Sequence, residues 1–166
     1  MWDALSGPMI NAKPEIHITL LSPLWDEEAV KPLIERALEA CTLLDNFSDH
    51  NVSIVLADDQ EIQGLNKQFR GFDKPTNVLS FPSDEDDFVP EGELRPLGDI
   101  ILAYETIQRE SREQDKPFND HLTHLIVHGF LHLLGYDHEE DVEAEKMEAL
   151  ESQILASLGI KDPYNT

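Results

Sequence analysis

Hydrophobic and polar positions along the chain follow two different spacings. Four short runs combine apolar and β-branched residues and are bounded by turn-forming residues, which is typical of β-strands. These runs are residues 16–21, 51–57, 77–82 and 98–103. Elsewhere apolar residues recur three and four positions apart, which predicts helices with one buried face. The predicted helices are residues 30–41, a segment capped by Asp58 or Asp59 that ends near Arg70 and Gly71, and residues 104–114, 119–134 and 139–159.

The order of these elements predicts the fold class. Strands alternate with helices at first, two strands then follow one another, and three helices end the chain. This order predicts an α/β (α+β) fold with a mixed four-stranded sheet covered by about five helices. A length of 166 residues predicts one domain over residues 1–166, of which residues 1–14 are expected to be loosely ordered.

Two residues of the first predicted helix bear on its limits and its role. Proline is well tolerated only in the first helical turn, so Pro32 means either that the helix begins near Val30 or that it kinks. Cys41 is the only cysteine and lies three residues after Leu38 on the apolar face. We therefore expect Cys41 to pack in the core rather than to form a disulfide, which suits the cytosol.

The composition is that of a globular protein, but the charge is unusual. Hydrophobic residues make up 40% and charged residues 28% of the chain, and the formal net charge is −22. Such a field repels nucleic acids and anionic membranes at long range. Residues 1–14 lack the basic start and apolar run of a signal peptide, and no apolar stretch approaches a membrane span. The sequence thus predicts a soluble cytoplasmic protein.

Acidic residues are concentrated in two places. One is the segment from Asp84 to Glu93, which also contains proline and glycine and is predicted to be a surface loop. The other runs from Asp137 to Glu151 near the C-terminus. Both are interpreted as solvated faces. A calcium-binding loop is the alternative for the first, but it lacks the alternating oxygen ligands and the central glycine.

Three of the seven histidines stand in the segment HGFLHLLGYDH, residues 128–138. His128 and His132 are four positions apart on a predicted helix, so both project from one face, as two ligands of a single metal must. Gly135 can adopt a positive φ and end the helix, which would allow His138 to return toward the same metal. The spacing predicts a metal site formed by His128, His132 and His138.

The donor atoms indicate the metal and its use. Imidazole nitrogens favour zinc, and three protein ligands leave a fourth tetrahedral position for water, which is typical of a catalytic site. Bound zinc lowers the pKa of water to about 7. We therefore expect one zinc ion per chain and a hydrolytic activity.

Simpler interpretations stay open for individual histidines. The alternative to a metal site is that His128 and His132 are satisfied within a buried helix and that His138 lies on the surface, but the spacing of all three favours a metal. His124, one turn before His128, is expected to support the site or to face the substrate. Asp137 is expected to orient a histidine or to begin the last helix. Histidines without a partner spacing are expected to be structural, namely His17, His50 and His121.

The same spacing occurs in the metzincin proteases, which carry a glutamate after the first histidine as general base. Gly129 stands at that position here. Met147, the only methionine after the histidines, lies in an acidic helical pattern and not in a turn. Because peptide hydrolysis needs the base, its absence argues against proteolysis.

Two further segments accompany the histidines. They are NKQFRGFDKPTNVLSFP at residues 66–82 and LGDIILA at residues 97–103. Together with HGFLHLLGYDH, and in this order, they resemble the YbeY family of bacterial endoribonucleases, also called rRNA maturation factors. The resemblance implies a zinc ion held by His128, His132 and His138, and cleavage of single-stranded RNA. It also implies roles in maturing the 3′ end of small-subunit ribosomal RNA and in ribosome quality control.

The resemblance further implies that Arg70 takes part in cleavage. From the sequence alone, Arg70 stands at a helix end, where its guanidinium would grip a phosphate bidentately or simply be favoured by the helix dipole. Five further residues match the family motifs, but no catalytic role follows for them: Asn66, Asp73, Thr76, Ser80 and Asp99. Whether a ribose 2′-hydroxyl or metal-activated water is the nucleophile stays open.

The net charge affects the choice of function. Lys67, Arg70 and Lys74 form the only obvious basic cluster, so affinity for free RNA is expected to be weak. Small-subunit or assembly proteins, many of them basic, would then supply the targeting. Two alternatives stay open: another zinc-dependent hydrolase of the metzincin type, and a non-catalytic, zinc-stabilised ribosome-assembly factor.

Overall fold

The computed structural model describes residues 12–84, 88–137 and 139–164. In them the chain forms four strands and five α-helices, in the predicted order. The elements are β2 (Glu15–Leu20), α1 (Glu27–Ala40), β3 (His50–Ala57), α2 (Asp59–Arg70), β4 (Val78–Pro82), β5 (Arg95–Ala103), α3 (Tyr104–Glu113), α4 (Phe118–Leu133) and α5 (Asp141–Ser157). A short 3-10 helix, η2 (Cys41–Leu43), follows α1. The predicted α+β fold class is confirmed, whereas most of the segment 1–14 lies outside the described residues.

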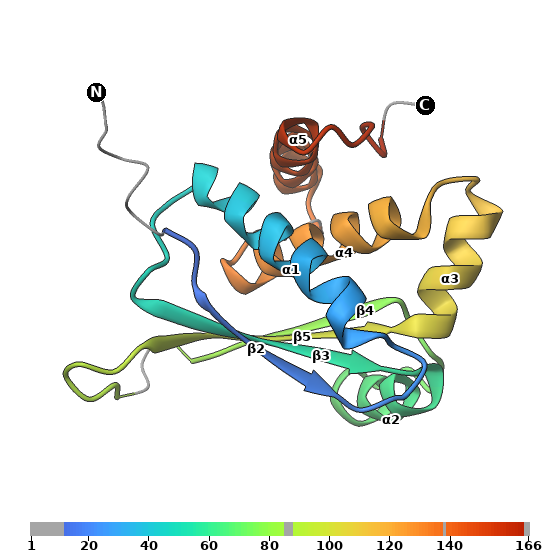
Figure 1. The fold of residues 1–166 in the computed structure, drawn as a ribbon, viewed down its shortest axis with the longest axis horizontal. Coiled ribbons are helices and arrows are strands. Elements are labelled where there is room, and N and C mark those ends of the chain that lie inside the picture. The colour runs from blue at the N-terminus through green and yellow to red at the C-terminus, as the bar shows by residue number, and fades with distance from the viewer. Residues whose placement is uncertain (1–11, 85–87, 138, 165–166) are drawn as a thin grey trace.

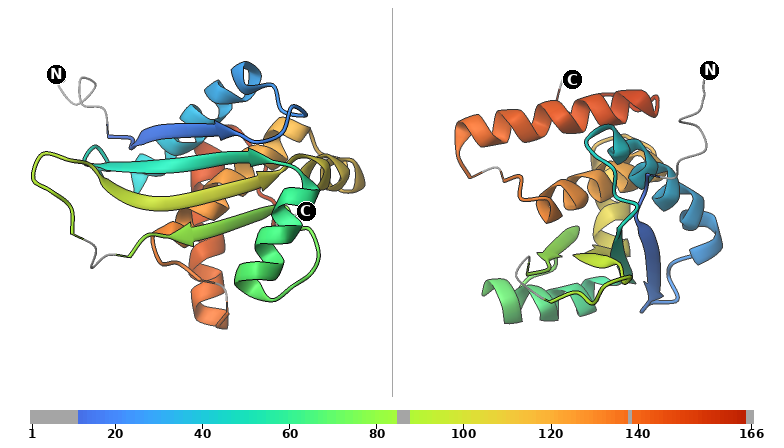
Figure 2. Two further views of the ribbon diagram at one scale, coloured as in Figure 1. Left: turned by 90° about the horizontal axis from the view of Figure 1, so that it is seen from below. Right: turned by 90° about the vertical axis from the view of Figure 1, so that its left-hand side faces the viewer.

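The four strands form one mixed sheet in the order β2-β3-β5-β4. β2, β3 and β5 run parallel, and β4 pairs antiparallel with β5. β4 thus occupies one edge, although it precedes β5 in the chain. Figure 1 shows α1 and α4 above one face of the sheet and α2 below the other, and Figure 2 shows the same sheet from below.

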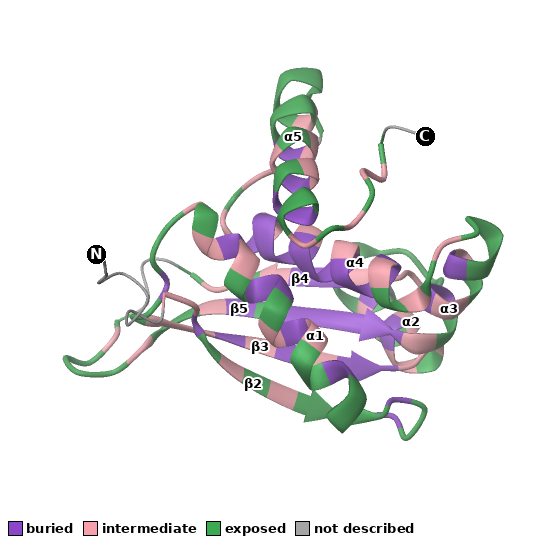
Figure 3. Ribbon diagram, turned by 45° about the horizontal axis from the view of Figure 1, so that its top comes forward, coloured by how far each residue is buried: buried purple, intermediate pink, exposed green. Residues whose placement is uncertain are grey.

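Each face of the sheet has its own hydrophobic cluster. The larger one joins alternate residues of β3, such as Val52, Ile54 and Leu56, to α1, α4 and the inner side of α5. A smaller one joins Ile62 of α2 to the opposite face of the strands. Figure 3 shows the buried residues concentrated in β3, β5 and α4. None of the helices in the described part of the chain is long and apolar enough to cross a membrane.

The structure shows where the helix that contains Pro32 begins. α1 begins at Glu27, and the carboxylate of Asp26 caps it by accepting a hydrogen bond from the Ala29 amide at 3.3 Å. The suggested start near Val30 is therefore wrong, because the cap lies upstream and the helix continues through Pro32. Cys41 is buried, as predicted, and burial raises the pKa of its thiol to about 12.

α2 has a well-defined beginning and end. Asp58, one of the two predicted caps, forms a capping box in which its carboxylate accepts from the Glu61 amide at 2.9 Å and Glu61 accepts in return at 3.1 Å. Gly71 ends the helix with φ +77°, a conformation that glycine adopts without strain. These two caps fix Arg70 as the last helical residue.

Candidate metal centre and active-site cleft

One face of α4 is open, and histidines occupy it. From His121 to Leu133 every residue is buried except His124, His128 and His132, which are partly exposed. Because each of these histidines follows the previous one by four positions, the three form a single stripe along the helix. The other sides of α4 pack on the sheet, α1 and α5. Tertiary packing therefore leaves the histidine stripe as the only part of this stretch that reaches the solvent.

The side of α4 that carries Gly129 is closed by the sheet. A Cβ atom at this position would lie 3.0 Å from Cγ2 of Ile100 and 3.0 Å from Oγ of Ser80. A glutamate here would have to displace Ile100 of β5 and Ser80 of β4, so the packing against the sheet favours glycine. Met147 is buried in α5 and not in a turn. The structure thus offers neither the general base nor the methionine turn of a metzincin protease among the residues described.

The ring nitrogens of His128 and His132 fit a shared metal ion. Their Nε2 atoms lie 3.1 Å apart, close to the roughly 3.3 Å that separates two ligands of tetrahedral zinc. Nδ1 of His132 lies 3.0 Å from the backbone oxygen of Tyr136. Nδ1 of His128 is hydrogen-bonded to the carboxylate of Glu151. In metal sites, ligating histidines use their second nitrogen in this way, which fixes the ring.

The turn after α4 follows the prediction as far as it is described. Gly135 has φ +99°, and the Tyr136 amide donates to the Leu131 carbonyl at 3.1 Å. The helix therefore ends and reverses where the sequence indicated. His138 lies outside the described residues, so its predicted role as third ligand stays a prediction. Asp137 lines the cleft but does not begin α5, whose N-cap is Glu140.

Glu151 lies in a different place from the one predicted for it. It belongs to the acidic run interpreted as a solvated face, yet its exposed fraction is 0%. Besides His128, its carboxylate contacts Nε2 of His124 at 3.2 Å and accepts a hydrogen bond from the Tyr164 hydroxyl. The surface interpretation is wrong for this residue, because α5 lies across α4 and brings Glu151 against the histidine stripe.

The environment of Glu151 favours its charged form. Burial by itself raises the pKa of this carboxyl, but hydrogen bonds from His124 and His128 and the charge of His128 outweigh burial and lower the pKa to about 2. Burial and the neighbouring Glu151 carboxylate raise the pKa of Tyr164. Tyr164 therefore remains a hydrogen-bond donor to Glu151.

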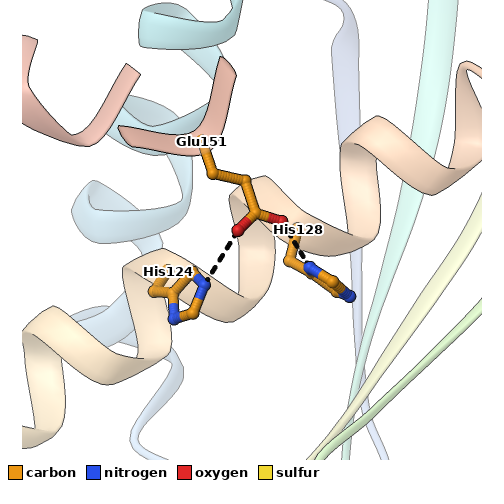
Figure 4. A group of neighbouring side chains, drawn as sticks. All are labelled: His124, His128 and Glu151. Atoms are coloured by element: carbon orange, nitrogen blue, oxygen red, sulfur yellow. Dashed lines mark hydrogen bonds and ion pairs between the residues drawn. The ribbon is translucent and has the colours of Figure 1, made fainter. Parts of the chain in front are cut away.

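Glu151 also completes a second set of metal-binding atoms. His124, His128 and Glu151 each offer one ligand atom, and these atoms all lie within 4.8 Å of one another (Figure 4). The group can hold a metal ion on the Nδ1 side of His128, whereas the pair with His132 uses Nε2. His124 is therefore a candidate ligand of this second group, and its role in supporting the site stays a prediction.

A cleft of about 750 Å³ brings together the predicted site residues that the structure describes, namely Arg70, His128 and His132. Its wall includes Arg70 from the end of α2 and the three stripe histidines from α4. The Arg70 guanidinium donates to the Ser80 carbonyl at 3.0 Å, and the Ser80 hydroxyl donates to the Gly129 carbonyl at 3.1 Å. Through β4, two hydrogen bonds therefore connect Arg70 to the residue next to His128.

A further polar group lines the same cleft. Nε2 of the buried His121 lies 2.9 Å from the Glu110 carboxylate, which also accepts from the Asn77 amide at 2.9 Å. Burial alone raises the pKa of the Glu110 carboxyl. A larger opposite effect comes from hydrogen bonds with His121 and Asn77 and from the charges of His121 and Arg109, so the pKa lies below its usual value. His121 is thus structural in the sense predicted, held by an acid on α3.

A histidine pair with oriented rings, a carboxylate behind it and an arginine across the cleft are typical of metal-dependent hydrolases that act on phosphate esters. The comparisons with known proteins identify the family. The family model "Endoribonuclease YbeY" matches residues 19–159. The chain therefore belongs to the YbeY family of endoribonucleases.

Individual relatives support this assignment. The chain is 46% identical over 171 residues to an endoribonuclease YbeY of Rhodopseudomonas palustris (strain BisB5), covering 98% of this chain and 88% of the relative. It is 54% identical over 139 residues to one of Chelativorans sp. (strain BNC1), covering 83% and 85%. The solution structure of TM1509 from Thermotoga maritima has the same fold, with a TM-score of 0.55, 28% identity, and coverage of 91% of this chain and 99% of the other.

Proposed function

We propose that this protein is a zinc-dependent endoribonuclease that cleaves single-stranded RNA in the cytoplasm. Its task would be to mature the 3′ end of small-subunit ribosomal RNA and to take part in ribosome quality control. The observation that carries the proposal is that Arg70 and the His128–His132 pair, far apart in the sequence, line one cleft. Membership of an endoribonuclease family makes RNA the natural substrate for this combination.

The metal ligands in this proposal are His128, His132 and His138, with one zinc ion per chain. Support comes from the 3.1 Å separation of the two described Nε2 atoms and from the Nδ1 partners that orient both rings. When bound, zinc supplies a Lewis acid for a phosphate oxygen and a water of lowered pKa. Glu151 then holds the His128 ring in place rather than serving as a ligand.

The role proposed for Arg70 is to bind the phosphate at the point of cleavage. Its guanidinium is exposed at the helix end, held by the Ser80 carbonyl and 5.8 Å from the centroid of the Phe81 ring. A planar guanidinium forms paired hydrogen bonds to two phosphate oxygens, and such contacts strengthen as charge develops in the transition state. The Arg70 guanidinium has no acceptor atom and cannot bind a metal ion. A substitution of Arg70 can therefore affect cleavage without affecting zinc binding.

The proposed partners follow from the charge. A chain of net charge −22 gains little from long-range attraction to RNA. We therefore expect the small ribosomal subunit or basic assembly proteins to bring it to its substrate, through contacts with the acidic surface.

The test of the cleavage mechanism is single-turnover digestion of a defined single-stranded RNA by wild type, Arg70→Ala and Arg70→Lys. Losing a charge-assisted hydrogen bond of about 1.5–3 kcal/mol should slow cleavage by roughly 10- to 150-fold. Lysine should recover little, because an ammonium cannot replace a paired guanidinium contact. Zinc content and melting temperature should stay at the wild-type values, and near-normal cleavage by Arg70→Ala would remove this residue from the mechanism.

The test of the metal site is elemental analysis of wild type, His128→Ala, His132→Ala and His138→Ala. Each substitution should abolish stoichiometric zinc, and chelation of the wild type should lower its melting temperature. Unchanged zinc content in all three would overturn the ligand assignment. Loss of zinc in His124→Ala and not in His132→Ala would place the metal on the Nδ1 side of His128.

The same preparation also distinguishes the other functions. Metal-dependent digestion of an unfolded protein, with RNA left intact, would restore the protease alternative despite Gly129. Zinc binding without any cleavage would favour the assembly-factor alternative. The chemistry of the RNA ends separates the two nucleophiles, since attack by the 2′-hydroxyl leaves a cyclic phosphate and attack by water does not.

A further inference from the structure

A second cleft adjoins the one that holds the histidines. Its volume is about 390 Å³, and five residues line both clefts: Arg70, Thr76, Asn77, Leu79 and Glu110. The rest of its wall includes Phe72, Lys74 and Arg109. The two clefts are therefore continuous at Arg70, the residue proposed to bind the phosphate that is cleaved.

The charge of this second cleft is opposite to that of the protein. Arg70, Lys74 and Arg109 are three of the chain's 12 basic residues, and the only acid in the wall is Glu110. The Glu110 carboxylate is already hydrogen-bonded to Asn77 and His121, whereas Arg109 has an ion-pair partner outside the wall, the Asp59 carboxylate at 3.9 Å. In a chain of net charge −22 such a concentration of cations is a local exception, and it suits a polyanion that leaves the first cleft past Arg70.

An exposed aromatic ring stands in the wall of the same cleft. Phe72 is 57% exposed, and Nζ of Lys74 lies 5.7 Å from the centroid of its ring. Burial in the core would ordinarily be expected of a phenylalanine. Aromatic rings beside cations are the means by which proteins bind single-stranded nucleic acids, because every base has a face that stacks.

The backbone around Phe72 is held in place. The Phe72 amide donates to the Asn66 carbonyl at 3.3 Å, and the Lys74 amide donates to the Phe72 carbonyl at 2.9 Å. The side-chain amide of Asn66, a residue only 4% exposed, donates to the Lys74 carbonyl at 2.9 Å. The turn that carries Phe72 is therefore held against α2 by hydrogen bonds to the buried Asn66. These bonds keep the Phe72 side chain in its exposed position.

We propose that the second cleft binds a nucleotide of the RNA strand adjacent to the one being cleaved. In this arrangement the base stacks on Phe72, and Lys74 and Arg109 attract the neighbouring phosphates. The inference rests on the proposed ribonuclease function and adds to it the path of the strand. Because stacking is tolerant of base identity, the subsite contributes affinity and length dependence rather than sequence preference.

The decisive experiment compares wild type, Phe72→Ala and Phe72→Trp in single-turnover cleavage of a labelled single-stranded RNA over a range of protein concentrations. Phe72→Ala should raise the half-saturating concentration by roughly 5- to 150-fold, the range that loss of one stacked base gives, with a maximal rate within about threefold of wild type. Phe72→Trp should keep a half-saturating concentration close to that of wild type, because tryptophan also stacks on a base. The matched control is Phe88→Ala, which removes a ring that is 87% exposed and lines neither cleft.

The charge is tested separately through salt. Lys74→Ala should weaken binding and lower the slope of the logarithm of affinity against the logarithm of salt concentration by roughly 0.7, the value for one phosphate contact of a single strand. Lys146→Ala, at an exposed lysine of α5, should leave the slope unchanged. Equal slopes for wild type and Lys74→Ala would exclude Lys74 from the path of the strand.

The outcomes separate this inference from the function on which it rests. If wild type cleaves RNA and Phe72→Ala saturates at the same concentration, the subsite is wrong and the ribonuclease function stands. If wild type cleaves no RNA, that function fails, and fluorescence anisotropy with the same labelled RNA decides the subsite by itself. Binding that depends on Phe72 would support it, and binding that does not, or no binding, would overturn it.

Discussion

The two acidic segments of this protein look alike in the sequence and differ in the folded chain. In the loop, Glu91 and Glu93 are exposed, as a solvated segment requires. In α5, Glu143 and Glu145 are also exposed, but Glu151 has no exposed surface and three polar partners. The number of nearby acidic residues therefore does not determine whether a glutamate is exposed or buried. Its position relative to the buried face of the helix does.

A signal for Glu151 was present in the sequence. It lies four residues after Met147 and four before Leu155, and both are buried in α5. An acid on an apolar helical face pays a large desolvation cost unless partners replace water. Such an acid is therefore expected to meet donors from another element, and in a chain with a histidine stripe those donors are histidines.

The largest expected effect that tests this contrast is on metal binding. Glu151→Gln keeps the size of the side chain but removes the charge that holds His128, so zinc affinity should fall by roughly 10- to 100-fold. The control is Glu145→Gln, at an exposed acid of the same helix, with an expected change of less than about twofold. Competition with a zinc-binding dye measures both. Equal affinities in the two variants would mean that Glu151 is buried without supporting the site.

A second, smaller effect concerns Glu110 and the pH. Because the pKa of Glu110 is lowered in the folded chain, its contribution to stability is complete above the unfolded pKa, near 4.5, and disappears as the pH falls through the lowered folded value. Glu110→Gln should therefore lose about 1 kcal/mol at pH 7 and progressively less below pH 4.5. Urea unfolding at several pH values measures this difference.

The matched acid for that experiment is Glu113, exposed on the same helix α3. Glu113→Gln should change the free energy of unfolding by less than about 0.5 kcal/mol at every pH. A pH-independent loss in Glu110→Gln would show that its role is one of packing and not of charge.

The smallest effect is expected in the acidic loop. The double variant Glu91→Gln, Glu93→Gln should keep the wild-type melting temperature and zinc affinity, because both side chains are exposed. Calcium should leave the melting temperature of the wild type unchanged, since the loop lacks the ligand spacing for this ion. If calcium raised the melting temperature of the wild type but not of the double variant, the loop would contain a calcium site and would not be merely a solvated segment.

The local structure of the chain could be predicted from its sequence. Alternating and helical spacings indicated the four strands and five α-helices found in the described residues, because side-chain direction in a strand or helix depends only on position along the chain. The ends of two helices, at Gly71 and Gly135, could be predicted because glycine adopts a positive φ without strain. The pairing of His128 with His132 followed from the helical period in the same way.

The tertiary structure alone decided which distant residues meet. The placement of β4 beside β5 at the sheet edge brings the end of α2 to α4, so that Arg70 and the histidines share a cleft. The packing of α5 across α4 turns Glu151 from a surface acid into the partner of His128. Such contacts depend on how whole faces of helices and sheets bury one another. The periodicity of one segment carries that information only when its partner is known.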